Sequence, residues 1–165
     1  MAYGETLLLA VPLLWVAAQP FVLQRAFGKG GNYSVRIQTE YLLIVAAVLI
    51  GAVTESLLSL MGIWAQPNDF TLPVWLLVLW ALLAGCLYHS FAWLAGRFVL
   101  GGVLAAISAP LSYVAGAALN ANYDLVNGWQ SLAKIALVWS AVFPLLLWLA
   151  SQFSNRQVFQ SARRV

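Results

Sequence analysis

Two side chains able to exchange protons lie inside long apolar stretches of this sequence. Glu55 stands within one stretch, and His89, the single histidine of the chain, stands in the next with Ser90 beside it. An ionised side chain near the middle of a membrane costs at least about 2.5–3.5 kcal/mol, so such residues face the protein and are commonly functional. An imidazole can act as an acid or a base near neutral pH. Glu55, His89 and Ser90 are therefore the candidate catalytic residues.

Each candidate also has a purely structural interpretation. A protonated glutamate can be satisfied by a neighbouring hydroxyl or carbonyl, and a single histidine is more often a packing residue than a catalyst. Glu55 continues a four-residue stripe formed by Ala47, Gly51 and Ser59, so it is expected to face the protein and to be neutral at pH 7. His89 lies on a similar stripe in the next stretch.

Helix geometry separates the two candidates in depth. At a rise of 1.5 Å per residue, the depths of Glu55 and His89 differ by about 10 Å. That offset exceeds the reach of a hydrogen bond, so a direct pair is not expected. At matching depth, we expect Glu55 to meet Ser140, Ser112 or Trp15 and His89 to meet Gln19 or Ser108.

The composition indicates that these stretches lie in a membrane. The chain has 165 residues, of which 63% are hydrophobic and 8% are charged, whereas a soluble domain carries about a quarter charged residues. The lysines and arginines form no basic stripe, so no nucleic-acid partner is predicted. Cys86 is the single cysteine, and the sequence contains no paired metal-ligand spacing or phosphate-binding loop. Neither a metal nor a cofactor is predicted.

Five apolar runs reach the roughly 20 residues that a helix needs to cross about 30 Å of hydrocarbon. Because the apolar residues are continuous and do not alternate, they predict helices and not strands. The sequence therefore predicts an all-α, polytopic transmembrane bundle of about five helices in a single integral membrane domain, 1–165. The predicted helices are 6–24, 40–64, 73–95, 98–119 and 132–153, followed by a short basic tail, 154–165.

Small residues recur at four-residue spacing, above all in the fourth predicted helix. Such residues allow the close backbone approach that holds membrane helices together. Because the fourth helix is small on several faces, we expect it to lie at the centre of the bundle. The positions expected at helix contacts are Gly51, Gly85, Gly101, Gly102, Ala105, Ala109, Ser112 and Gly116.

Several segments between Gly51 and Leu149 resemble a bacterial membrane family catalogued as domain of unknown function 2878. They are GAVTES at 51–56, LPVWLLVLW at 72–80, HSFAWL at 89–94, APLSYVAG at 109–116 and PLLLWL at 144–149. The resemblance implies a helical membrane architecture and carries no established activity. It also implies an association with envelope or lipid-modification genes.

Three functions agree with these features. The absence of a recognisable catalytic constellation favours a non-catalytic or accessory component of the bacterial inner (cytoplasmic) membrane. Such a component would lie in the lipid bilayer. The sequence is compatible with a membrane-protein partner and with association of two copies of the chain. A water-filled cavity reaching Glu55 would instead favour a small channel or transporter. A lipid-shaped groove reaching His89 would favour a lipid-modifying enzyme or accessory in which His89 or Glu55 handles protons.

Charges are sorted between alternate connections. Arg25, Lys29 and Arg36 follow the first apolar run, Arg97 separates the third from the fourth, and the tail holds further arginines. The two remaining connections carry only acidic charges. Under the positive-inside rule this pattern places the N-terminus outside and the C-terminus in the cytoplasm.

We predict that single cysteines replacing Asp69 and Asp124, in a Cys86→Ser background, react with a membrane-impermeant maleimide in intact spheroplasts. A cysteine replacing Arg163 should react only after the membrane is permeabilised, because the basic tail is retained on the cytoplasmic side. Labelling in the opposite pattern would overturn this orientation.

Overall fold

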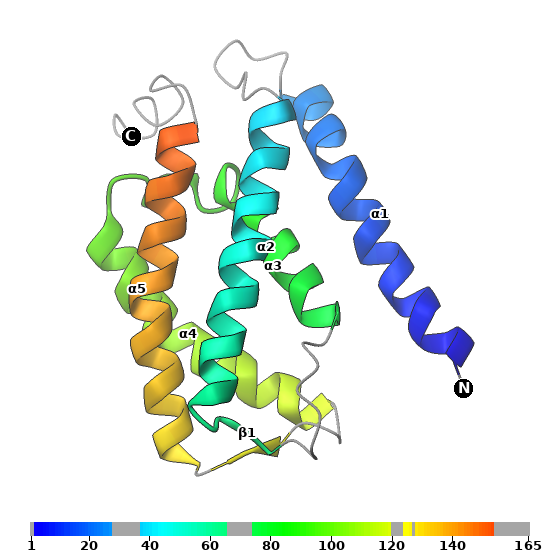
Figure 1. The fold of residues 1–165 in the computed structure, drawn as a ribbon. Helices are drawn as coiled ribbons and strands as arrows, with labels where there is room; N and C mark the ends of the chain where they lie inside the picture. The colour runs from blue at the N-terminus through cyan, green and yellow to red at the C-terminus, as the bar shows by residue number, and fades with distance from the viewer. Residues whose placement is uncertain (1, 28–36, 66–73, 120–123, 127, 154–165) are drawn as a thin grey trace.

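Five α-helices make up most of the described structure, a computed structural model that covers residues 2–27, 37–65, 74–119, 124–126 and 128–153 (Figure 1). The helices are α1 (Ala2–Phe27), α2 (Ile37–Leu60), α3 (Val74–Leu87), α4 (Phe98–Leu119) and α5 (Trp129–Phe153). A 3-10 turn, η2 (Ala92–Leu94), precedes α4. Two short strands, β1 (Trp64–Ala65) and β2 (Asp124–Leu125), pair antiparallel at one end of the bundle. The predicted all-α class is confirmed.

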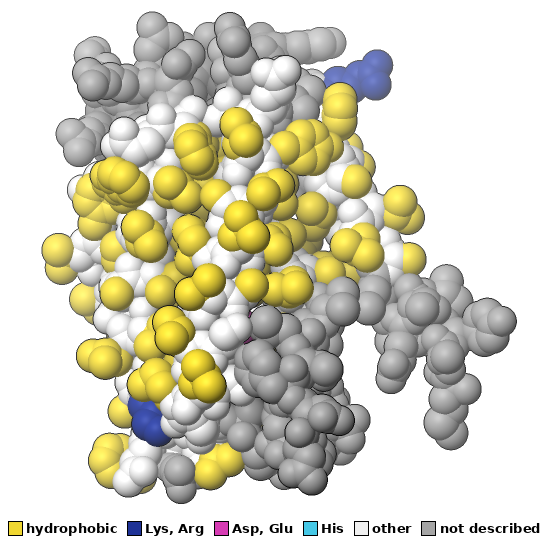
Figure 2. All heavy atoms as spheres, in the orientation of Figure 1, with side chains coloured by type: hydrophobic (Ala, Val, Ile, Leu, Met, Phe, Trp, Pro, Cys, Tyr) yellow, Lys and Arg dark blue, Asp and Glu magenta, His cyan; other side chains and the backbone are white. Residues whose placement is uncertain are grey.

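Three of the described helices are long and apolar enough to cross a membrane: Gln38–Leu60, Phe98–Ala118 and Trp129–Phe153. The other two helices contain shorter apolar stretches, Ala10–Gln19 and Leu76–Leu87. Figure 2 shows hydrophobic side chains across the middle of the visible face, with the described basic side chains toward its two ends. This distribution is typical of a membrane protein, in which the apolar outer surface contacts lipid and the charged residues lie near the two membrane surfaces.

The centre of the bundle is occupied by α2 and α3. α2 contacts α1, α3 and α5, whereas α4 makes its largest contact with α5 alone. On the other side of α4, Val99, Ile107 and Leu111 are exposed. The predicted central place of the fourth helix is therefore wrong. Gly101 and Gly102 adjoin α5, and the apolar outer side of α4 is suited to lipid.

Two helices end earlier than the sequence predicted. α2 stops at Leu60 because Gly62, at φ 69°, forms a helix-ending turn in which Ile63 N–H donates to the Leu58 carbonyl. α3 stops at Leu87 instead of near 95. The chain then turns, and the Cys86 carbonyl accepts the N–H groups of both His89 and Phe91.

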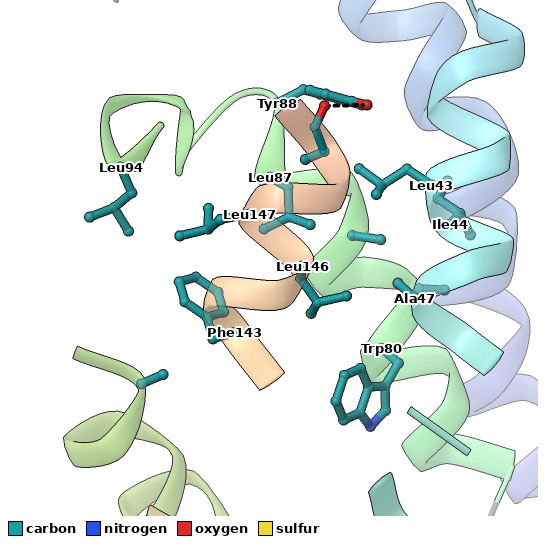
Figure 3. Close-up of a cluster of buried hydrophobic side chains, with 14 residues drawn as sticks. Leu43, Ile44, Ala47, Trp80, Leu87, Tyr88, Leu94, Phe143, Leu146 and Leu147 are labelled. Carbon is teal, nitrogen blue, oxygen red and sulfur yellow. Dashed lines mark hydrogen bonds between the residues drawn. The ribbon is translucent and has the colours of Figure 1, made fainter. Parts of the chain in front are cut away.

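The hydrophobic core joins α2, α3 and α5 (Figure 3). Leu43 from α2, Leu87 from α3 and Leu146 from α5 have no exposed surface. Tyr88 closes one end of this cluster, and its hydroxyl donates to the Ala150 carbonyl at 3.2 Å. This bond ties the turn after α3 to α5, which gives a tertiary reason for the early end of α3.

Small residues allow close contact at most of the predicted positions. A Cβ at Gly51 would collide with the Trp80 ring, one at Gly85 with the side chain of Gln19, and one at Gly101 with Leu147. Ala105 and Ala109 are buried.

Two of the predicted contact positions behave differently. A Cβ at Gly116 would meet nothing within 4 Å, and Ser112 is exposed. Helix α4 therefore makes its close contacts nearer its N-terminal end, and the four-residue spacing continues beyond them. The predicted loop position Asp69 and the basic tail, 154–165, lie outside the described residues.

We predict that Gly102→Leu destabilises the bundle while Gly116→Leu does not. A Cβ at Gly102 would lie 2.8 Å from the Ser140 carbonyl oxygen and 3.2 Å from Pro144 Cγ. Overpacking of this kind typically costs about 1–3 kcal/mol. Both changes gain similar helix propensity, so the second is a matched control. Thermal unfolding in detergent provides the measurement, and equal melting temperatures for the two variants would contradict the close α4–α5 contact.

Candidate functional site

Glu55 is buried on the inner side of α2. Its exposed fraction is 2%, and Ala47, two turns earlier on the same stripe, is fully buried. The stripe therefore faces the protein, as the spacing predicted. The adjacent hydroxyls are bonded within their own helix: Thr54 donates to the Ile50 carbonyl and Ser56 to the Ala52 carbonyl. The partners of the carboxyl group come from other helices.

Three aromatic side chains form a hydrogen-bonded network around the carboxyl group. Tyr113 of α4 donates its O–H to Glu55 Oε1, and Trp80 of α3 donates its indole N–H to the same oxygen at 3.1 Å. Trp139 of α5 donates its N–H to the Tyr113 hydroxyl oxygen at 3.3 Å. Four helices thus each contribute one side chain to a single polar cluster, which we call the Glu55 cluster: Glu55, Trp80, Tyr113 and Trp139.

Aromatic packing fixes the positions of these donors. The rings of Trp80 and Trp139 stack with their centroids 4.8 Å apart and their planes at 21°. Gly51, one turn before Glu55 on the stripe, leaves the space that the Trp80 ring occupies. A side chain at position 51 would displace the indole from the carboxyl group, so the glycine is needed for the hydrogen bond.

The two oxygens of the carboxyl group have different surroundings. Oε1 accepts both hydrogen bonds, from Trp80 and from Tyr113. Oε2 is buried and has no hydrogen-bond partner among the described residues. A buried polar atom without a partner is uncommon in native proteins and calls for an explanation.

A cavity of about 270 Å³ adjoins the cluster. All four members of the Glu55 cluster line it, and its remaining walls are mostly apolar. These walls are formed by Leu76, Leu79, Leu83, Ser112 and Gly116. The arrangement combines an apolar container with one carboxyl group, so it can receive an apolar body and hydrogen-bond a single polar group.

The sequence-predicted partners of Glu55 occupy other places. Ser140 donates to the Leu137 carbonyl, and Ser112 lines the cavity while donating to the Ser108 carbonyl. Trp15 is about half exposed, at 48%. The sequence did not predict the actual partners of Glu55, Trp80 and Tyr113, or Trp139, which donates to Tyr113. The available signal was their polar atoms, because a buried tyrosine or tryptophan usually finds a hydrogen-bond partner.

His89 belongs to a second polar site, distant from the first. It lies in the turn after α3, and not on the predicted helical stripe, with Nε2 3.4 Å from Glu40 Oε1. Glu40 and Glu55 are separated by 15 residues of α2, or about 22 Å along the helix. The expected absence of a direct Glu55–His89 pair therefore agrees with the geometry. Ser90 is exposed in the same turn.

Gln19 and Ser108, the residues expected at the depth of His89, each have other contacts. Gln19 is buried against Gly85, and the Ser108 carbonyl accepts a bond from Ser112. Within the described ranges, no group of three or more histidine, cysteine, aspartate or glutamate side chains is placed to hold a metal ion. The Glu55 cluster itself offers one carboxyl group, one phenol and two indole N–H donors.

Comparison with known proteins agrees with the family resemblance of the sequence. A family model described as a protein of unknown function (DUF2878) matches residues 6–145. The match extends beyond the segments first compared and includes Glu55, Trp80, Tyr113 and Trp139. No curated protein matches the chain, and no solved structure does.

We predict that Tyr113→Phe weakens the Glu55 cluster. The change removes the donor to Glu55 Oε1 and the acceptor of the Trp139 N–H, and an unsatisfied buried group costs about 1–3 kcal/mol. The melting temperature should fall, and the infrared band of the Glu55 carboxyl group should shift. Tyr41→Phe is the control, since its hydroxyl bonds the Ala17 carbonyl. A carboxyl band that moves equally in both variants would contradict the network.

Proposed function

Because the chain belongs to the DUF2878 family of proteins of unknown function over residues 6–145, and because a cavity meets a buried carboxyl group in it, we propose a ligand-binding role in the bacterial cytoplasmic membrane. The ligand is an amphipathic small molecule. The observation that carries this proposal is the cavity of about 270 Å³ with Glu55 in its wall. Binding pockets are typically concave and mostly apolar, with a few polar groups that orient the ligand.

The volume of the cavity limits the size of the ligand segment that it can hold. An enclosed apolar cavity of about 150 Å³ accommodates one benzene molecule. By that measure, the cavity of about 270 Å³ has room for roughly ten to twelve non-hydrogen atoms. This corresponds to a medium-length alkyl segment or a two-ring system. A larger lipid would insert one segment and leave the remainder outside.

The walls favour an apolar body over a column of water. Leu76, Leu79 and Leu83 recur on α3 at spacings of three and four residues, and therefore present one side of that helix to the cavity. The stacked indoles of Trp80 and Trp139 add further apolar area. Such walls support amphiphile binding better than conduction of ions, which requires a continuous polar path.

Binding without catalysis is also the simplest chemistry for the cluster. Tyr113 and Trp80 direct their donors at Glu55, so the polar groups already hold one another in place. His89 is paired with Glu40 and is not among the residues that line the cavity. We therefore place the protein among accessory membrane components that hold or present a lipid-soluble molecule, with the bilayer as its source.

We predict that native mass spectrometry of the purified protein finds one retained small molecule in the wild type, which Gly116→Leu abolishes. Gly116 lines the cavity and its α-carbon faces open space, so a leucine there should fill the cavity without disturbing the helix contacts. Ala115→Leu is the matched control, because Ala115 is exposed on the same helix and does not line the cavity.

Retention by the wild type and Ala115→Leu, with loss in Gly116→Leu, would support a ligand in this cavity. Equal retention in all three proteins would show that the molecule lies elsewhere. No retained molecule in any of them would count against a tightly bound ligand.

A further inference from the structure

The packing of the four helices that line the cavity leaves one side of it open. The largest helix contacts join α2 to α3 and α4 to α5, and α2 also contacts α5. Between the described residues of α3 and α4 there is no comparable packing. Both helices nevertheless line the cavity, α3 through its leucines and Trp80, and α4 through Ser112, Tyr113 and Gly116. The cavity is therefore a groove between α3 and α4, and α2 and α5 form its floor.

The exposure of the lining side chains shows in which direction this groove opens. Glu55 and Trp80 are each 2% exposed, and Tyr113 is buried. Leu79 of α3 is 51% exposed and Ser112 of α4 is also exposed, although both residues line the cavity. Lining residues with a large exposed surface form the rim of a cavity. The groove thus opens sideways, between Leu79 on one helix and Ser112 on the other.

The opening lies at the depth of the membrane hydrocarbon. Ser112 and Gly116 belong to Phe98–Ala118, one of the spans long and apolar enough to cross a bilayer. Leu111 and Val114, which flank the rim on α4, are exposed apolar side chains. None of the described residues that line the groove is basic, and most of them are apolar. At this depth an apolar opening is surrounded by lipid chains.

We infer that the groove holds one hydrocarbon chain of a bilayer lipid, which enters sideways between α3 and α4 while the headgroup stays at the membrane surface. The volume of about 270 Å³ admits roughly ten to twelve non-hydrogen atoms, so part of one acyl chain fits and a whole phospholipid does not. This inference rests on the proposed function, and it specifies the class of ligand and its route into the same cavity.

The place of the groove along the helices agrees with a headgroup at the surface. On α3 the lining residues cover positions 76–83, about 10 Å along the helix axis, so the groove is elongated. Leu76 lies in the first turn of α3, and Gly116 lies in the last turn of α4. The groove therefore begins near the ends of both helices. A lipid anchored at that surface can place its chain in the groove without moving its headgroup into the hydrocarbon.

A phospholipid with a diazirine midway along one acyl chain tests the inference. The full chain is reconstituted in phosphatidylglycerol nanodiscs that contain a small fraction of this probe, and the residues labelled on irradiation are identified by mass spectrometry. In the wild type, label should appear on Glu55 or Trp80, which lipid around the outside of the bundle does not reach because each is 2% exposed. Exposed residues such as Leu111 should also be labelled, and they report the surrounding lipid.

Two variants should close the groove. Gly116→Leu fills it, and Ser112→Phe narrows its rim without removing a bond between helices, because the Ser112 hydroxyl bonds the Ser108 carbonyl of its own helix. Both changes should abolish the label on the floor of the groove and retain the label on the outer surface. Ala115→Leu is the matched control, because Ala115 is exposed on α4 and does not line the cavity, and both labels should persist in it.

The outcomes separate this inference from the proposed function. Label confined to exposed residues of the wild type would overturn the lipid chain; a small molecule retained in native mass spectrometry and lost in Gly116→Leu would then leave a different ligand in the cavity. Absence of both the floor label and a retained molecule would reject the proposed function as well. Floor label that persists in both groove-closing variants would also overturn the inferred route.

A thiol at the rim tests whether lipid or water fills the opening. Ser112→Cys in a Cys86→Ser background should resist a cationic methanethiosulfonate reagent in nanodiscs, because hydrocarbon excludes the charged reagent and disfavours the reactive thiolate. Reaction as fast as that of an unfolded control would show a water-filled opening and would overturn the inference.

Discussion

The hydrogen bonds to Glu55 Oε1 organise the part of the bundle nearest the β1–β2 pair. An acidic side chain on α2 accepts from α3 through Trp80 and from α4 through Tyr113, and Tyr113 in turn accepts from Trp139 of α5. Lipid tails cannot compete for these polar atoms, so the bonds remain satisfied only when the helices are assembled. They set the depth at which the helices meet. The cavity lies between these helices, so the assembly that buries Glu55 also creates the cavity.

Much of this arrangement follows from simple patterns in the sequence. Continuous apolar runs predict helices, and the stripe through Ala47 and Gly51 predicts that Glu55 faces inward. Gly51 on the same stripe leaves room for the Trp80 ring, so the indole N–H can reach the Glu55 carboxyl group. What the pattern could not supply was the identity of the partners. The depth of a residue along its helix restricts which side chains could meet Glu55. The rotation of each helix about its axis decides which of them faces the carboxyl group, and that rotation depends on packing across the whole interface.

The early end of α3 also depends on tertiary contacts that the sequence pattern does not reveal. Residues 88–91 contain no glycine or proline, so no local signal ends the helix. The chain turns there because tertiary contacts replace helical ones: Tyr88 bonds the Ala150 carbonyl, and His89 lies beside Glu40. Gly62, by contrast, is a local signal for the end of α2 that the apolar run concealed. The misplacement of α4 has a related cause, since small residues on several faces permit contact without requiring it.

The two buried glutamates of α2 have neighbours of different chemistry. Glu40 and Glu55 are both buried, at 8% and 2% exposure, on one helix. Glu40 Oε1 lies 3.4 Å from Nε2 of His89, so the group beside it is an imidazole of the same bundle. Glu55 receives only neutral donors, and both of them bond the same oxygen. Neutral donors on Oε1 hold the carboxyl group in position, while Oε2 is buried with no hydrogen-bond partner among the described residues.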